Sequence, residues 1–406
     1  MRTATLLLLS SLLTGATWAQ SFEVTSQLRL NDTTPRTTRA MALGSATDPL
    51  GDADMAANPA TLATIKRPMF FVQCARNSLA VVSDYSALRA LYPQSVEATS
   101  LSQIAAAAPF GPIVAGAYYA SEPRIESPID GAIAFGSTPY VAPPCTNDCA
   151  IYRFDPIPYQ RAEQRFGVAM AWERGALTFG AGAELQQVVE RLEVPRIYFS
   201  PPAGPSQFDR LFRRVDSRAV VPNAGVRWRV TPRIALAAAY NGAGSFTRTT
   251  SACNMAQPVS RDTSLTCTSA AVPLASSSER LPDAWRAGAA FAVTERLRLV
   301  AEGVRRHYSK LADDPYTIFG AAQRFPYLDV TELHAGAEFK LRPVALRVGW
   351  WRDPSRVNVL PSGGTSVTHR TLGAGINLGG ARLDIAYDDA SLRYQRRAVV
   401  GLGFGL

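Results

Sequence analysis

The sequence feature that most constrains the fold is a strict two-residue alternation between Thr331 and Trp351. Through residue 341 one file of side chains is apolar, apart from its first threonine, and the other file is polar, charged or small. After a turn at Arg342-Pro343 the alternation resumes and continues to Trp350, so the stretch predicts a β-hairpin with two different faces. An unbroken apolar face opposite charges and glycines is better explained by lipid outside and a polar lumen inside than by a soluble sheet.

The same alternation recurs from Pro68 to the end of the chain. It predicts an opening strand at 69–76, six hairpins and a closing strand at 398–406, hence about fourteen strands. An even number in this range is typical of bacterial outer-membrane barrels. The expected fold is all-β: a transmembrane antiparallel β-barrel over residues 67–406. The hairpin turns are Phe110-Gly111-Pro112, Arg174-Gly175, Thr231-Pro232, Thr294-Glu295-Arg296, Arg342-Pro343 and Gly379-Gly380.

Tight turns and long connections fall on opposite ends of the expected strands. In an outer-membrane barrel the short turns and both termini face the periplasm, so the long connections are extracellular. A secreted all-β sandwich is the soluble alternative. The long connections are expected near residues 77–100, 121–162, 190–214, 249–282, 310–328 and 354–368.

Two strands carry expected irregularities. Between Leu297 and Ser309 the valines Val300 and Val304 share a side with Glu302, which predicts a bulge or a misplaced boundary. A kink near Gly116 would open a lateral exit, and it predicts a break in backbone pairing there.

The amino terminus has the features of a secretory signal peptide at residues 1–19. A basic start at Met1-Arg2 precedes an apolar run at 6–13 and a small-residue cleavage site at 17–19, with mature protein beginning near Gln20. No cysteine follows the run, so a lipoprotein is not expected. No other stretch reaches the roughly 18 apolar residues that a membrane helix needs. These features predict export to the outer membrane of a Gram-negative-type bacterium.

The formal net charge is +9, and the arginines are scattered along strands and loops. Nucleic-acid binding is not expected, because it requires a basic patch or stripe. Contact with outer-membrane lipid and acidic lipopolysaccharide, or the lining of a pore, explains the charge better.

Four of the five cysteines bracket polar loops. Cys145 pairs with Cys149 and Cys253 with Cys267 in the expected disulfides, since an exported protein reaches an oxidising compartment. Cys74 is left over on a strand. A metal site at Cys145 and Cys149 lacks the second close ligand pair of zinc sites, so no metal is expected.

Seven charged residues fall on the predicted inward faces of strands. A salt-bridge network that stabilises the barrel explains them better than ligand contact does. His334 and His369 are also expected to face the lumen. The seven are Arg165, Glu184, Arg227, Glu338, Arg347, Arg382 and Asp384.

His307 and Ser309 lie two apart on an expected strand and would share a face, as a catalytic His/Ser pair would. Nucleophilic catalysis also needs an orienting partner and an oxyanion site, and the sequence supplies neither. The chain is therefore not expected to be an enzyme or to hold a cofactor.

Residues 20–66 lack the strand alternation, and turns or short helical pieces are expected there. Their motifs are Met41-Ala-Leu-Gly-Ser-Ala, Asp52-Ala-Asp54 and Asn58-Pro59-Ala60-Thr-Leu62. This order resembles the start of the FadL-type outer-membrane transporters, in which an Asn-Pro-Ala-Gly-Leu motif follows small and acidic residues; Thr61 stands where glycine is usual. The later half is similar in Trp285-Arg-Ala-Gly-Ala, His334-Ala-Gly-Ala-Glu-Phe, Leu346-Arg-Val-Gly-Trp and Leu383-Asp-Ile-Ala-Tyr387.

The resemblance implies a monomeric fourteen-stranded barrel, inserted by the barrel-assembly machinery, that moves long-chain fatty acids or aromatic hydrocarbons by facilitated diffusion. It also implies that residues 20–66 form a hatch inside the barrel, with Asn58, Pro59 and Ala60 at its turn. Two alternatives stay open: a barrel acting as an assembly or secretion partner, and a general diffusion porin, which a filled lumen would exclude.

Overall fold

The computed structural model describes residues 36–50, 53–81, 94–121, 125–136, 149–198, 207–254, 267–280, 282–310, 316–318, 321–323, 328–354, 366–391 and 396–405. The expected signal peptide, residues 20–35, Asp52 and Cys145 lie outside these ranges, as does the side chain of Cys149. Within them the helices are α3 (Thr38–Ala42), η1 (Pro59–Thr64) and η2 (Tyr308–Lys310). No helix of the described part is long and apolar enough to span a membrane.

Seventeen strands form one antiparallel sheet, and a separate two-stranded sheet pairs β13 (Tyr316–Ile318) with β14 (Ala321–Gln323). The strands of the large sheet are β1 (Met69–Val81), β2 (Gln94–Phe110), β3 (Ile113–Ser121), β4 (Ile125–Gly136), β5 (Cys149–Arg174), β6 (Leu177–Tyr198), β7 (Gln207–Thr231), β8 (Ile234–Asn241), β9 (Ser245–Asn254), β10 (Val272–Arg280), β11 (Ala284–Ala292), β12 (Leu297–Arg306), β15 (Val330–Leu341), β16 (Val344–Asp353), β17 (Val367–Leu378), β18 (Ala381–Ala390) and β19 (Arg397–Gly405).

The large sheet closes on itself because β1 pairs with β19 on one side and with β2 on the other. Three barrel strands are interrupted: β3 and β4 both pair with β5, β8 and β9 both pair with β7, and β10 and β11 continue one another beside β9 and β8. Counting each interrupted strand once gives the predicted fourteen-stranded antiparallel barrel. All six predicted turns join consecutive strands of this sheet.

The two faces of each strand have opposite character. On β5 the side chains of Phe166, Val168, Met170 and Trp172 point outward and are 43% to 61% exposed, and the alanines between them are buried. The same outward apolar file continues on β15 and β16, whereas charged residues lie on the inward face. Such an outer surface is costly in water and favourable in lipid, as expected for a transmembrane barrel.

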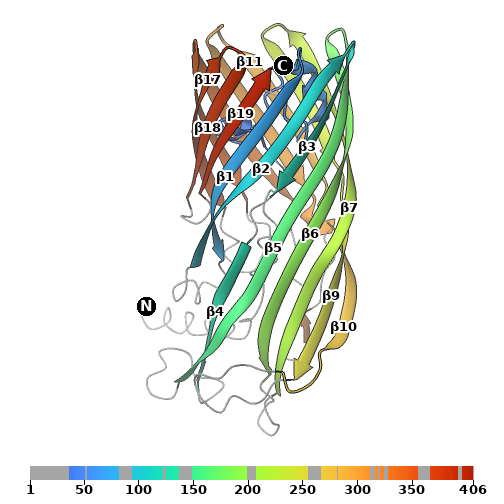
Figure 1. Ribbon diagram of the computed structural model, residues 1–406, viewed down its shortest axis with the longest axis vertical. Helices are drawn as coiled ribbons and strands as arrows, with labels where there is room; N and C mark the ends of the chain where they lie inside the picture. Colours follow the sequence, from blue (N-terminus) through green and yellow to red (C-terminus); the bar gives the residue numbers. More distant parts are fainter. Residues whose placement is uncertain are drawn as a thin grey trace, which may run out of the picture.

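Several strands run further than the sequence indicates. The expectation that 121–162 and 190–214 are long loops is wrong for most of their length, because β4 to β7 extend through them; β5 has 26 residues and β7 has 25. Figure 1 shows β5, β6 and β7 reaching well beyond the ends of β17 to β19. The strand ends were predicted from the outward-facing apolar side chains, which are needed only where a strand meets lipid. The backbone hydrogen bonds between strands need no apolar side chains, so the strands continue beyond that point.

Of the two predicted irregularities, the first is a misplaced boundary and the second is absent. β12 pairs with β11 and with β15 in unbroken register, so the predicted bulge is wrong. The alternative of a misplaced boundary is confirmed, because β12 ends at Arg306 and Tyr308–Lys310 form η2. Val300 faces inward beside Glu302 because it packs against Leu43 and Ala46 of the amino-terminal residues. The kink at Gly116 is wrong as well, since β3 pairs continuously with β2 and β5 on either side of it.

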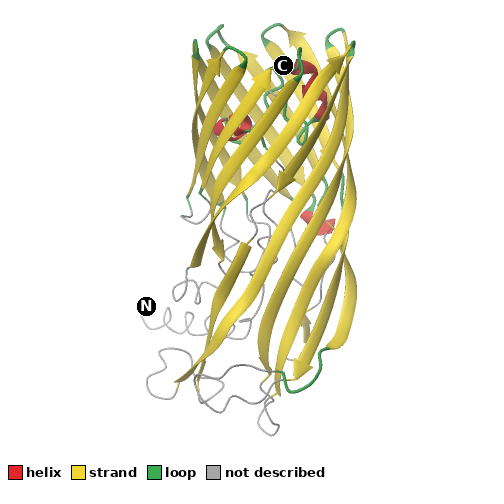
Figure 2. Cartoon of the chain, in the orientation of Figure 1, coloured by secondary structure: helices red, strands yellow, loops and turns green. Residues whose placement is uncertain are grey.

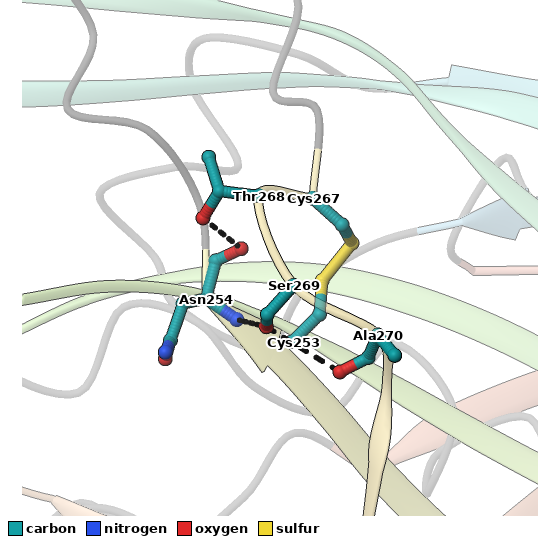
Figure 3. The surroundings of a disulfide bond; sticks show 6 residues. All are labelled: Cys253, Asn254, Cys267, Thr268, Ser269 and Ala270. Carbon is teal, nitrogen blue, oxygen red and sulfur yellow. Dashed lines mark hydrogen bonds between the residues drawn. A yellow bond between two sulfur atoms is a disulfide. The ribbon is translucent and has the colours of Figure 1, made fainter.

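The predicted disulfide between Cys253 and Cys267 is confirmed, with its Cα atoms 5.7 Å apart at the end of β9. Figure 3 shows the hydrogen bonds that accompany it: Asn254 N–H donates to Ser269 Oγ and the Thr268 hydroxyl donates to the Asn254 carbonyl. Cys74 is a free, exposed cysteine on β1.

The amino-terminal segment, defined as residues 36–50 and 53–66, is enclosed by the barrel strands, and Figure 2 shows its short helices behind the strands. α3 contacts β16 to β19, and η1 contacts β3, β5, β6 and β7. These two groups of strands lie on roughly opposite sides of the closed sheet. The segment therefore bridges the lumen.

Candidate functional site

The candidate site is the lumenal surface on which the amino-terminal segment rests. Asn58 is the N-cap of η1: its side chain accepts a hydrogen bond from Ala60 N–H at 3.0 Å and donates to the Ala238 carbonyl of β8 at 3.3 Å. Pro59 follows at a helix start, where an N–H would have no helical partner. The Thr61 hydroxyl donates to the Asn58 carbonyl at 2.7 Å. Thr61 therefore stabilises this turn through its hydroxyl group, although glycine is usual at this position in the family that the motif resembles.

Two glycines on the wall make room for this turn. A Cβ atom at Gly180 on β6 would lie 2.7 Å from Ala60 Cα, and one at Gly225 on β7 would lie 2.8 Å from Asn58 Cγ. Both separations are below the contact distance of real Cβ atoms. We call Gly180 and Gly225 the first glycine seat.

Gly336 on β15 and Gly349 on β16 form the second glycine seat, which holds Leu43 and Gly44 of the segment. Gly44, at φ +70°, donates its N–H to Thr371 Oγ1 at 3.0 Å, and its carbonyl accepts from His334 Nδ1 at 2.8 Å. A Cβ at Gly336 would lie 2.5 Å from the Leu43 carbonyl oxygen. A Cβ at Gly44 would in turn meet the backbone of β15 and β16. Only glycine therefore fits on both sides of this contact.

Between the seats the segment packs through apolar side chains. Met55, Leu62 and Ile65 join a buried cluster with Phe71 of β1 and Tyr118 of β3. Burial of such side chains removes apolar area from water and stabilises the docked segment.

A charge cluster fastens the segment near the second seat. Arg39 donates from Nε to Glu338 on β15 at 2.8 Å and from Nη2 to Asp48 at 2.5 Å, and Arg298 of β12 donates to the same Asp48 oxygen at 2.6 Å. Burial alone would raise the pKa of Asp48, but Arg39 and Arg298 together hold that pKa below its usual value. Asp48 is therefore ionised between two guanidinium groups.

The same cluster continues into the barrel wall. Arg347 of β16 donates to Glu338 and to Asp384 of β18, both at 2.8 Å. Arg382 pairs with Asp384 at 2.7 Å. Four of the seven sequence-predicted lumen residues are thus brought together, and Arg39 connects them to the segment.

A second cluster surrounds Glu302 on β12. Arg36 lies 3.4 Å from Asp54 within the segment and 3.9 Å from Glu302, which also accepts from Arg286 at 3.3 Å. The Thr47 N–H donates to Glu302 at 2.7 Å. This cluster holds the segment near the junction of β11 and β12.

The remaining predicted lumen residues lie on the wall of β5 to β7. Arg165 pairs with Glu163 and with Glu184, and Glu184 also accepts from Tyr118 and Gln186. Arg227 is separate: its Nε donates to the Pro49 carbonyl of the segment.

His307 and Ser309 do not share a strand face, and that expectation is wrong because β12 ends at Arg306. His307 Nδ1 lies 3.0 Å from Asp283, whereas Ser309 donates its N–H to Asp329 at 2.9 Å. The two residues therefore have different partners and form no Ser–His pair.

His334 and His369 face the lumen on either side of Trp351. The ring centroid of Trp351 lies 5.4 Å from that of His334 and 3.7 Å from that of His369. The Asp388 carboxylate accepts hydrogen bonds from both His369 and Trp351. Within the described ranges no group of three His, Cys, Asp or Glu side chains is arranged to hold a metal ion.

Several residues that fasten the segment were not found from the sequence. Arg36, Arg39 and Asp48 lie in a stretch without periodicity, so no pattern assigns them a face. The inward glycines were a usable signal, because small residues on a lumenal face permit close backbone approach.

Comparison with known proteins supports the fold only through structure. No family model matches the chain, and no curated protein matches it. Among solved structures, a Pseudomonas aeruginosa FadL homologue aligns with a TM-score of 0.60 at 15% identity, covering 91% of this chain and 96% of that one. The Ralstonia pickettii toluene transporter TbuX aligns with a TM-score of 0.59 at 16% identity, covering 92% and 99%.

A third structure, the CymD monoaromatic hydrocarbon channel, has a TM-score of 0.59 at 14% identity and covers 92% of this chain and 98% of its own. The chain therefore has a FadL-type fold over nearly its whole length.

Proposed function

We propose that this chain is an outer-membrane transporter that passes hydrophobic small molecules by facilitated diffusion, with its amino-terminal segment as a hatch. The observation that carries the proposal is the buried segment between two glycine seats on roughly opposite walls. A lumen occupied in this way blocks free passage of water-soluble molecules. Asn58, Pro59 and Ala60 form the turn of the hatch at the first seat.

An apolar interior wall supports a hydrophobic cargo. Val188, Val215, Ala219 and Phe246 form a buried cluster on β6, β7 and β9, in the strands that extend beyond the lipid-facing belt. Apolar compounds gain free energy among buried apolar side chains of this kind and would not gain it in a water-filled pore. The solved structures of similar fold include channels or transporters for monoaromatic hydrocarbons and toluene, which is the same class of cargo.

The two alternatives fit less well. A general porin needs an open lumen, whereas residues 36–50 and 53–65 are largely buried inside this barrel. An assembly or secretion partner would need no apolar interior cluster. We therefore favour a non-catalytic transport role in the outer membrane, carried out by a single chain.

Uptake in cells tests the proposal. Cells that lack their own transporters would express the wild type or Asn58→Ala, and uptake of labelled toluene, a labelled long-chain fatty acid and a labelled sugar would be compared. The expected result is uptake of an apolar compound without sugar flux in the wild type, and altered apolar uptake in Asn58→Ala, because the variant loses the bonds to Ala60 and Ala238.

Asn377→Ala is the matched control, since Asn377 is exposed at the end of β17 and the segment contacts that strand at Thr371. Sugar flux through the wild type would support a porin instead. Wild-type cells that take up none of the three compounds would contradict the transport proposal.

A further inference from the structure

A polar cluster lies on the wall of β3, β5 and β6, beside the apolar contact that the hatch makes with Tyr118. It consists of Glu163, Arg165, Glu184, Gln186 and Tyr118, each at least nine-tenths buried. Arg165 is shared between the two glutamates: its Nε lies 2.8 Å from Glu163 Oε1 and its Nη1 lies 3.3 Å from Glu184 Oε1. These five residues include two carboxyl groups and one guanidinium group.

The cluster also contains a hydrogen-bond acceptor with no donor. Gln186 donates from Nε2 to Glu184, which fixes the orientation of its amide, and its Oε1 is buried without a hydrogen-bond partner. Glu184 already accepts from Arg165, Gln186 and the Tyr118 hydroxyl. A buried carbonyl without a donor costs free energy, which a donor delivered by a ligand would recover.

Apolar side chains lie next to this acceptor. Gln186 is followed by inward-facing Val188 on β6 and pairs across the sheet with Ala219 of β7. Val188 and Ala219 belong to the apolar cluster with Val215 and Phe246. An acceptor-rich polar end therefore adjoins an apolar wall, as a molecule with an apolar body and a polar head would require.

The geometry points to a lumenal site for hydrophobic molecules that carry a protonated amine. The ammonium group donates to Gln186 Oε1 and is attracted by Glu184, while the hydrocarbon body lies on the Val188 and Ala219 surface. A carboxylate head is disfavoured, because it would approach two glutamates and an acceptor. This inference rests on the proposed function and deepens it by naming a cargo class.

Binding to the purified full-length protein in lipid nanodiscs tests the inference by equilibrium dialysis. The probes share one tail and differ in the head: phenylbutylammonium, phenylbutanol and phenylbutanoate. The expected order is ammonium tightest and carboxylate weakest, with about tenfold or more between them, the size of a hydrogen bond to a charged group. Glu184→Gln and Gln186→Leu should each weaken ammonium binding by about tenfold and leave carboxylate binding no weaker.

Gln187→Leu is the matched control, because the next side chain along β6 points to the opposite face of the strand. Heat-dependent gel mobility confirms that each variant is a folded barrel. Phenylbutanoate binding as tightly as phenylbutylammonium, or an unchanged Gln186→Leu variant, would overturn the inference while leaving transport of apolar compounds intact. Failure of all three probes to bind would overturn the inference, whereas the uptake assay decides the transport proposal.

Discussion

Substituting a seat glycine should release the hatch without disturbing the barrel strands. In Gly225→Ala the new Cβ overlaps Asn58 Oδ1 and lies 2.8 Å from Asn58 Cγ, so the asparagine side chain must leave its position. It then loses the bond from Ala60 N–H and the bond to the Ala238 carbonyl. Alanine itself is compatible with a β-strand, so the cost falls on the docked segment.

The size of the effect follows from the two lost bonds. An N-cap is worth about 0.5 to 2 kcal/mol, and an ordinary hydrogen bond about 0.5 to 1.5 kcal/mol. The docking equilibrium should therefore shift by about 1 to 3.5 kcal/mol, or about 5- to 400-fold toward release. Gly180→Ala should cost more, since its Cβ meets the backbone at Ala60 Cα, 2.7 Å away, and no side-chain rotation relieves that contact.

Ion conductance of the purified barrel in a planar bilayer measures hatch release directly. The wild type should conduct rarely, Gly225→Ala more often, and Gly180→Ala most often. Gly303→Ala is the control, because a Cβ there meets nothing within 4 Å. The reasoning is refuted if Gly225→Ala conducts no more than the wild type, or if Gly303→Ala raises conductance equally.

Three further outcomes are expected. Glu338→Gln removes the carboxylate shared by Arg39 and Arg347, so the free energy of unfolding should fall by about 3 to 5 kcal/mol. Urea unfolding of the folded barrel would show this as a lower midpoint concentration. The pKa of Asp48 is held below its ordinary value of about 3.9, so the ionised carboxylate stabilises the docked segment above that pH. This stabilisation is lost as the pH falls through the lowered pKa. Acid should therefore raise the conductance of the wild type more than the conductance of Asp48→Asn. Replacing Cys253 and Cys267, 14 residues apart, with serine should speed hydrogen exchange in β9 and β10 by the equivalent of about 3 kcal/mol and leave β15 to β18 unchanged.

The lipid-facing part of the fold could be read from the sequence because the membrane imposes one rule on every strand. Outward residues such as Phe166 and Leu346 must be apolar wherever they meet lipid, and this fixes both the period and the register. The six turns followed from the places where that file stops and restarts. The outer halves of β5 to β7 were missed because no lipid constrains them.

The interior could be predicted only in kind. Alternation assigns Glu338, Arg347 and Asp384 to the lumen, but it does not say which of them meet. The ion pair between Arg39 and Glu338 joins residues 299 positions apart. The sequence around either residue contains no pattern that identifies its partner. Val300 breaks the expected polar face because it meets Leu43, so an apparent irregularity was a contact with the segment.

The inward glycines carry the missing information about where the segment lies. At seven of them, on strands from both sides of the barrel, an added Cβ would meet a residue between Thr38 and Ala60 of the segment. These seven are Gly116, Gly180, Gly225, Gly336, Gly349, Gly373 and Gly401. Gly303, which points outward between inward-facing Glu302 and Val304, meets nothing within 4 Å. Contact with lipid requires apolar side chains on the outward face. Contact with the enclosed segment requires residues without a side chain at particular positions of the inward face. These seven glycines therefore trace the path of the segment across the lumen, whereas a Cβ at inward Gly167 or Gly288 meets the barrel wall itself. The conductance of glycine variants should rise only along that path.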